Sequence, residues 1–193
     1  MKTYTQEELK EILELHQKWL NNEGGIRANL YSSDLNGANL SNANLSNANL
    51  CNSDLSGANL KYANLSSSDL SHANLKGANL SGANLKGSDL SSSDLSHANL
   101  KGANLSGANL LRTIGDMQSV KSFQVEKYMI TYTDAILNIG CRSYTIDEWN
   151  NFTNKQVSDM DNGSLEWWSK WKPIIMQIIK MSPAESTLKE NND

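Results

Sequence analysis

Residues 28–57 read ANLYSSDLNGANLSNANLSNANLCNSDLSG, and the regular spacing of leucine in this stretch decides the fold. From Leu30 to Leu110 every fifth residue is leucine, without a gap. The residue before each leucine is asparagine or aspartate, and the one before that is alanine or serine. Because neither an amphipathic helix nor a simple strand has a period of five, residues 28–112 form a repeat of short units.

A five-residue unit cannot bury an apolar face alone, so the pattern predicts a solenoid whose stacked neighbours share one core. We expect the leucines and the Ala/Ser residues to point inward and the other three positions to face water. Stacked asparagines before the leucines should form outward ladders. Glycine two places after leucine, as at Gly37, suits a corner where the backbone bends.

The units A-N-L-x-x and S-D-L-x-x resemble the pentapeptide-repeat family over residues 28–112. This resemblance implies a mainly β fold, namely a right-handed quadrilateral β-helix with four units per coil. The seventeen leucine-containing units would then make about four coils.

Residues 1–27 are predicted to form an N-terminal capping helix over the first coil. Thr5 and Glu8 have the spacing of a capping box, and apolar residues recur at three and four positions from there to residue 20. His16 lies on the apolar side, where we expect a packed structural histidine. Trp19 and Ile26 are expected to complete the lid.

Residues 113–182 are predicted to form a small α+β C-terminal domain. Runs at 120–125, 128–133 and 136–141 are typical of strands, and Thr145 with Glu148 predicts a second helix start. Residues 164–181 predict a helix in which Pro173 introduces a kink or a new start. The polar residues 183–193 are expected to be a disordered tail.

The predicted helix 164–181 is apolar nearly all round, so it is buried by its own domain or shared with a second chain. A homo-oligomer through this helix is therefore expected. The candidate oligomerisation residues are Ile174, Ile175, Ile178 and Ile179.

Four tryptophans fall close together near the C-terminus, and tryptophan is enriched in binding hot spots. A domain of this size also needs large side chains in its core, so we assign two of the four to the core and leave one or two for a partner. The candidate partner-binding residues are Trp149, Trp167, Trp168 and Trp171, with the carboxylates Asp159, Asp161 and Glu166. The segments IGDM, NIGC, TIDEW and LEWW resemble the C-terminal region of pentapeptide-repeat proteins of bacteriophages and prophages.

The aspartates of the repeat form a candidate acidic face: Asp34, Asp54, Asp69, Asp89 and Asp94. In a coil of twenty residues the first, second and fifth share one face and the other two share the next. The alternative is that each aspartate simply follows a serine and that nearby lysines neutralise it. Residues 66–85 recur unchanged at 91–110, so His72 and His97 are interpreted as duplicates and not as a metal pair.

Composition argues against several classes of function. The formal net charge is −4, which attracts neither nucleic acid nor an anionic membrane. The histidines are scattered, no phosphate-binding loop occurs, and the two cysteines form no paired spacing, so we expect no enzyme, metal or cofactor. With no signal peptide and no membrane-length apolar run, a cytoplasmic location in a bacterial host is expected.

The preferred hypothesis is a non-enzymatic phage or prophage protein that binds and modulates a host defence or DNA-processing protein. The rod would serve as scaffold and the C-terminal domain as the recognition or dimerisation element. Three alternatives stay open. The first is a DNA mimic directed at gyrase or topoisomerase, which the family resemblance implies; the others are a self-assembling structural component and a binder of a small molecule such as a nucleotide signal.

Overall fold

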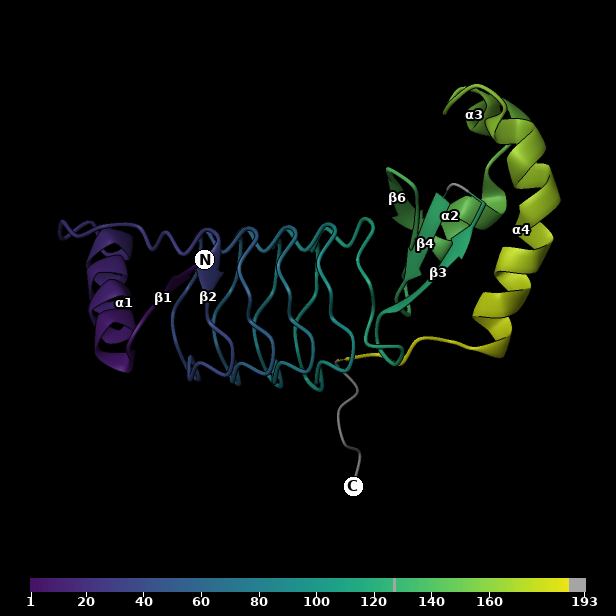
Figure 1. Cartoon of the computed structure of the whole chain (residues 1–193). Coiled ribbons are helices and arrows are strands. Elements are labelled where there is room, and N and C mark those ends of the chain that lie inside the picture. Colours follow the sequence, from purple (N-terminus) through teal and green to yellow (C-terminus); the bar gives the residue numbers. More distant parts are fainter. Residues whose placement is uncertain (127, 188–193) are drawn as a thin grey trace.

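The computed structural model describes residues 1–126 and 128–187. A rod of stacked coils forms the middle of the molecule (Figure 1). Helix α1 (Gln6–Leu20) lies at one end, and a four-stranded sheet followed by helix α4 (Ser164–Met181) lies at the other. The β-solenoid, the N-terminal helix and the C-terminal α+β region are therefore present as predicted.

The rod is built by parallel β-bridges between residues twenty positions apart, from Asn29 with Asn49 to Asp94 with Ile114. One coil thus takes twenty residues. The leucines point inward, and those of the central coils, such as Leu45, Leu65 and Leu85, are fully buried. The handedness and the four-sided cross-section stay predictions from the family resemblance.

The asparagines that precede leucines have two roles in the coil. The Asn44 side-chain oxygen accepts a hydrogen bond from the Ser46 backbone N–H at 3.3 Å, which closes the turn. The amide nitrogen of Asn64 donates to Asn44 at 3.2 Å, and that of Asn84 donates to Asn64 at 3.1 Å. The predicted asparagine ladder is confirmed.

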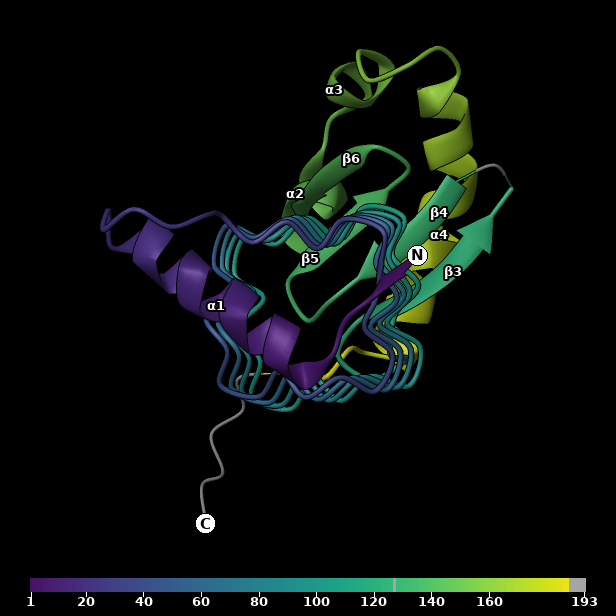
Figure 2. The same ribbon diagram turned by 60° about the vertical axis from the view of Figure 1, so that its left-hand side comes forward.

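Helix α1 covers the leucine layer at the N-terminal end, and Figure 2 shows it lying across the opening of the coils. The predicted capping box is present, with Thr5 N donating to Glu8 at 2.7 Å and Glu8 N donating to Thr5 at 3.2 Å. Leu9 is 2% exposed and belongs to the core of the rod. Ile26 is 66% exposed, so its expected place in the lid is wrong.

Buried His16 joins α1 to the first coil. Its Nε2–H donates to the carbonyl of Ser46 at 3.0 Å, and its Nδ1 accepts from the Ala28 N–H at 3.1 Å. The two partners fix the neutral tautomer, because one nitrogen must donate while the other accepts. Burial lowers the pKa of this imidazole, which favours the same neutral form. The interpretation as a structural histidine is confirmed.

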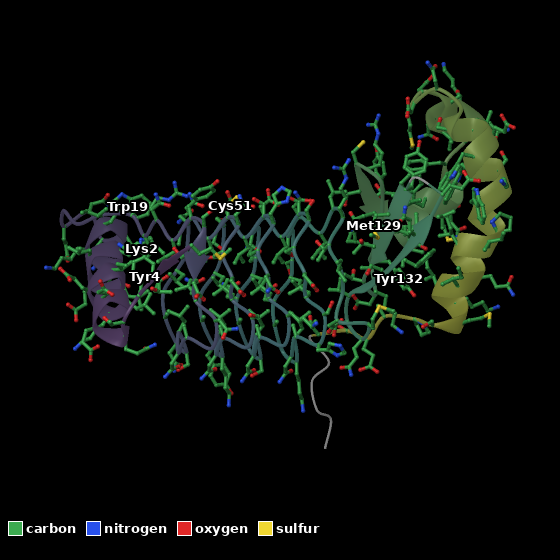
Figure 3. The ribbon with its side chains drawn as sticks, in the orientation of Figure 1. Lys2, Tyr4, Trp19, Cys51, Met129 and Tyr132 are labelled. Atoms are coloured by element: carbon green, nitrogen blue, oxygen red, sulfur yellow. The ribbon has the colours of Figure 1, made fainter. Side chains whose placement is uncertain are left out.

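Strand β1 (Lys2–Thr3), which the sequence does not predict, pairs in parallel with β2 (Ser33–Asp34) in the first coil. This pairing occupies backbone groups that would otherwise form an open edge. Lys2 and Tyr4 lie beside α1 (Figure 3), with the ammonium of Lys2 4.5 Å from the centre of the Tyr4 ring.

The C-terminal sheet is antiparallel, in the order β3 (Lys121–Val125), β4 (Tyr128–Tyr132), β5 (Ile136–Ile139) and β6 (Arg142–Thr145). The sequence predicts the first three strands and misses β6. Helix α2 (Ile146–Asn151) begins with the predicted capping box of Thr145 and Glu148. Helix α3 (Asn154–Ser158) begins with a further, unpredicted box of Thr153 and Gln156.

Helix α4 shares a hydrophobic core with the sheet, on the side away from the rod (Figure 1). It is one continuous helix that contains Pro173, so the predicted second start is wrong. Ile175 is fully buried in this core and is therefore wrong as an oligomerisation contact. Ile174 is 45% exposed, and Ile178 and Ile179 are half-buried.

Residues 183–187, here called the C-terminal strap, return from α4 to the rod (Figure 1). The Tyr132 hydroxyl donates to the carbonyl of Ser182 at 2.7 Å and fixes the start of the strap. Glu185 N donates to Gln118 O at 2.9 Å, and Gly102 N donates to Thr187 O at 2.8 Å. These bonds contradict the predicted disordered tail at residues 183–187, while residues 188–193 lie outside the described residues.

Candidate functional site

The four C-terminal tryptophans divide into two buried and two half-buried side chains. Trp149 is 3% exposed and Trp168 is 4% exposed, whereas Trp167 and Trp171 are half-buried. The indole N–H of Trp149 donates to the carbonyl of Leu137 at 2.7 Å. The indole N–H groups of the other three are buried and have no hydrogen-bond partner among the described residues. Trp149 therefore has the environment of a core residue, and the other three have unused donors.

A small apolar cavity of about 110 Å³, here called the aromatic slot, lies between the β5–β6 turn, α3 and the start of α4. Its walls include Tyr128, Cys141, Trp149, Met160, Trp167 and Trp168. The rings pack edge to face or tilted, with centroid distances of 4.7 Å for Tyr128 with Trp167 and 5.0 Å for Trp149 with Trp168. Pockets for small-molecule ligands usually measure about 300 Å³ or more, so this slot is sized for a single side chain.

Polar groups around the slot are mostly engaged, with two exceptions. Arg142 donates to the carbonyl of Met160 at 2.7 Å, and Asp161 accepts from the Asn162 N–H at 2.8 Å. The exceptions are the indole N–H groups of Trp167 and Trp168, which are buried and have no hydrogen-bond partner among the described residues. Leaving such a donor unpaired costs about 1–3 kcal/mol. The slot is therefore large enough for one apolar side chain, and its wall contains two tryptophans whose indole N–H groups have no partner among the described residues.

Trp167 and Trp171 also lie close to Glu126 in the β3–β4 turn. Lys170 forms a 3.0 Å ion pair with Glu126 and is the main cause of the lowered pKa of that carboxyl. The indoles of Trp171 and Trp167 add to the effect, although neither donates a hydrogen bond of normal length. The ion pair is largely exposed, so its contribution to stability is small.

The structure brings together some of the predicted partner-binding residues. Trp149, Trp167, Trp168 and Asp161 line the aromatic slot, whereas Trp171, Asp159 and Glu166 do not. The sequence reasoning missed Tyr128, Cys141 and Met160 as slot residues. A sequence signal existed for Cys141 alone, in the NIGC segment, whose Gly140-Cys141 turn joins β5 to β6.

The five aspartates of the rod fall into two neighbouring columns. The bridges join Asp34 to Asp54 and Asp69 to Asp89, and they connect Asp94 to the first column through Asn74. Each carboxylate accepts a backbone N–H two residues later, as the asparagines do; for Asp54 the acceptor distance from Ser56 N is 2.9 Å. These acids therefore close turns, and they are half-buried.

Within residues 1–126 and 128–187 no group of three or more His, Cys, Asp or Glu side chains could hold a metal ion. Over the same residues no helix has the length and apolar character to cross a bilayer.

The family model for pentapeptide repeats matches eight copies at residues 33–72 and 73–112. A solved pentapeptide repeat protein from Nostoc Pcc 7120 is 39% identical, over 49% of this chain and 71% of that chain, with a TM-score of 0.36. The chain therefore belongs to the pentapeptide-repeat family. The family model ends at residue 112, and no comparison supports the predicted resemblance of the C-terminal region to phage proteins.

Two further solved structures are similar. A pentapeptide repeat protein from the cyanobacterium Cyanothece 51142 is 38% identical over 47% of this chain and 62% of that chain, with a TM-score of 0.46. QnrB1, a plasmid-mediated fluoroquinolone resistance protein, is 24% identical over 51% of this chain and 64% of that chain, with a TM-score of 0.30. The chain thus covers under two thirds of each of these two proteins. A comparison with curated proteins finds no match, and nothing in the matched family indicates an enzyme.

Proposed function

We propose that this chain is a non-catalytic binding protein that recognises a protein partner through the aromatic slot. The observation that carries the proposal is a slot sized for one side chain whose wall includes Trp168, a tryptophan with a buried indole N–H that has no partner among the described residues. A partner would insert an apolar side chain and supply a carbonyl or hydroxyl oxygen to this donor. In this proposal residues 1–27, 28–112 and 113–182 act as cap, rigid scaffold and recognition domain.

The rod is the weaker candidate for recognition. Between residues 28 and 112 its five aspartates are balanced by four lysines and one arginine. A DNA mimic must instead reproduce the dense negative charge of phosphates. Because each rod carboxylate also accepts a turn hydrogen bond, the gyrase-directed alternative has little free acidic surface to use.

The finer identity of the partner follows only from the sequence resemblance of the C-terminal region. On that basis we propose a host defence or DNA-processing protein, encountered in a bacterial cytoplasm, and a phage or prophage origin. Recognition by the slot does not depend on this origin.

The test is affinity capture from bacterial lysate followed by a binding measurement with the purified partner. Trp168→Phe keeps an aromatic ring and removes the N–H, so we expect affinity for the partner to fall about tenfold. The matched control replaces Asp34, Asp54, Asp69, Asp89 and Asp94 together by Asn and should retain binding. Loss of binding in the control and not in Trp168→Phe would transfer recognition to the rod.

The self-assembly alternative makes a separate prediction. If the protein acts only by packing against copies of itself, light scattering should show a mass that grows with concentration, and Ile174→Asp should abolish that growth. A constant monomer mass would exclude this alternative and leave the slot proposal intact.

A further inference from the structure

The core of the last coil is open on one side. One coil earlier, Leu85 and Ser88 are 0% and 1% exposed. Their counterparts twenty residues later, Leu105 and Ala108, are only half-buried. Nothing among the described residues continues the parallel bridges beyond Asn109 and Ile114. Apolar side chains that belong to the core pattern therefore face a space instead of a further coil.

A cavity of about 450 Å³, here called the junction cavity, occupies this space. Its walls are residues 105–110 of the last coil, residues 133–136 around the β4–β5 turn, Ser119, Ser143 and the C-terminal strap. The volume lies within the range of about 300–1,000 Å³ that is usual for ligand pockets. The cavity shares no lining residue with the aromatic slot.

The strap takes the place of the missing coil at one corner. In the preceding coil Gly82 N donates to Lys101 O at 2.9 Å. At the end of the rod the equivalent donor, Gly102 N, bonds to Thr187 O at 2.8 Å. This bond holds the strap over the cavity and brings Glu185 to its wall.

The lining combines apolar surface with negative charge. Leu105, Ala108 and Ile136 provide the apolar part. The charged residues of the wall are Asp134 and Glu185, both of them solvent-exposed, and none of the described lining residues is basic. The ion pairs found among the described residues are Lys10 with Glu14 and Lys170 with Glu126, so neither wall carboxylate is neutralised in this way.

We propose that the junction cavity binds a small aliphatic amine, such as a diamine. An ammonium group would pair with Asp134 or Glu185, and charge-assisted hydrogen bonds of this kind are stronger than neutral ones. The methylene chain would lie on Leu105 and Ala108 and complete the core of the last coil. An anion is disfavoured because no cationic side chain of the described residues meets it there.

The test is calorimetric titration of the full chain with 1,5-diaminopentane, with pentane-1,5-diol as a neutral match of equal length. We expect saturable binding of the diamine and none of the diol. Asp134→Asn and Glu185→Gln should each weaken binding about threefold, because each removes an exposed charged partner. Asp147→Asn, at an exposed carboxylate in α2, is the control and should bind as the wild type does.

Three results would overturn the proposal: no saturable diamine binding, equal binding by the diol, or unchanged affinity in both wall variants. Melting temperatures of the variants establish that they are folded. Trp168→Phe should leave diamine affinity unchanged, so failure of the junction cavity and failure of the aromatic slot are distinguishable.

Discussion

Each end of the rod has an apolar layer that must be covered, and the two ends are covered in different ways. At the N-terminal end, α1 and β1 come directly before the first coil and bury Leu9 and His16 to 2% and 0% exposure, although a smaller cavity of about 250 Å³ remains beside α1. At the C-terminal end the covering sheet has its own core with α4 and leaves a cavity of about 450 Å³. A local segment can be shaped to the leucine layer, whereas a separately folded region makes contact at fewer points.

The contacts at the C-terminal end explain why it stays open. Val120 is fully buried in the core of the rod and covers part of the last coil. The sheet is joined to the rod by polar contacts: Thr131 donates to Thr113 O at 3.1 Å, and Gly115 N donates to Ser122 at 3.0 Å. Asn138, the cross-strand partner of Thr131, is buried with its amide nitrogen unpaired within the described residues. Small polar side chains such as these do not bury the apolar residues at the end of the rod.

The largest expected effect compares a buried aliphatic side chain at each end. Leu9→Ala should lower the free energy of unfolding by about 2–5 kcal/mol, because it leaves a cavity under α1. Val120→Ala removes fewer methyl groups and adjoins an end that is already open, so we expect about 1–2 kcal/mol. Urea unfolding followed by circular dichroism measures both. A larger loss for Val120→Ala would reverse our ranking of the two ends.

His16→Phe tests whether the N-terminal end is held by polar contacts as well as by packing. Two buried groups, Ser46 O and Ala28 N, lose their partner, so we expect a loss of about 2–3 kcal/mol at pH 7.5. Equilibrium unfolding of the variant and the wild type provides the measurement. A loss below about 0.5 kcal/mol would mean that these bonds contribute little.

The same histidine predicts a pH dependence. Its folded-state pKa is lowered from 6.5, so below that pH the unfolded chain binds a proton that the folded chain does not. The contribution is complete above about pH 6.5 and is lost as the pH falls towards the folded-state pKa. Comparing pH 7.5 with pH 5.5, the wild type should lose more stability than His16→Phe. Equal losses would exclude His16 as the source.

Tyr132→Phe tests the anchor of the C-terminal strap. Removing the hydroxyl breaks its bond to Ser182 O and should cost about 1 kcal/mol. Because the strap then loses this anchor, limited proteolysis after α4 should also become faster. Tyr31→Phe, an exposed tyrosine of the first coil, is the matched control and should change neither quantity.

The smallest effect is expected in the middle of the rod, where neither end contributes. Asp69 and Asp89 are bridge partners in adjacent coils, and two carboxylates cannot form the ladder bond that asparagines form. Asp89→Asn should therefore raise stability by about 0.5 kcal/mol. Asn84→Asp, which breaks an existing ladder bond to Asn64, should have the opposite sign. Destabilisation by Asp89→Asn would contradict this account of the columns.

Most of the fold could be predicted because its signals are local. The period of five placed the leucines inside, and Thr5 with Glu8 and Thr145 with Glu148 marked two helix starts. Strand β1 was missed because Lys2 and Thr3 pair with residues that follow about thirty positions later. Strand β6 was missed because Arg142 and Ser143 are exposed and lack the alternation of a half-buried strand.

The candidate site could be predicted only in part, since it depends on where segments meet. The tryptophans were visible as a group, but only the packing distinguishes Trp149, whose N–H is satisfied, from Trp168, whose N–H has no partner in the described part of the chain. The junction cavity gave no sequence signal at all. It arises because the strap, the β4–β5 turn and the last coil, which are far apart in the chain, enclose one space.

The twenty-residue coil has a consequence for how such a protein can change during evolution. Because the repeat unit is a quarter of a coil, gain of four units lengthens the molecule and keeps the two terminal elements in the same angular relation. Gain of one unit instead advances everything after it by a quarter of the circumference. The repeated segments 66–85 and 91–110 are offset by twenty-five residues, the sum of both kinds of step. Unit number therefore sets the direction in which the aromatic slot points relative to the N-terminus.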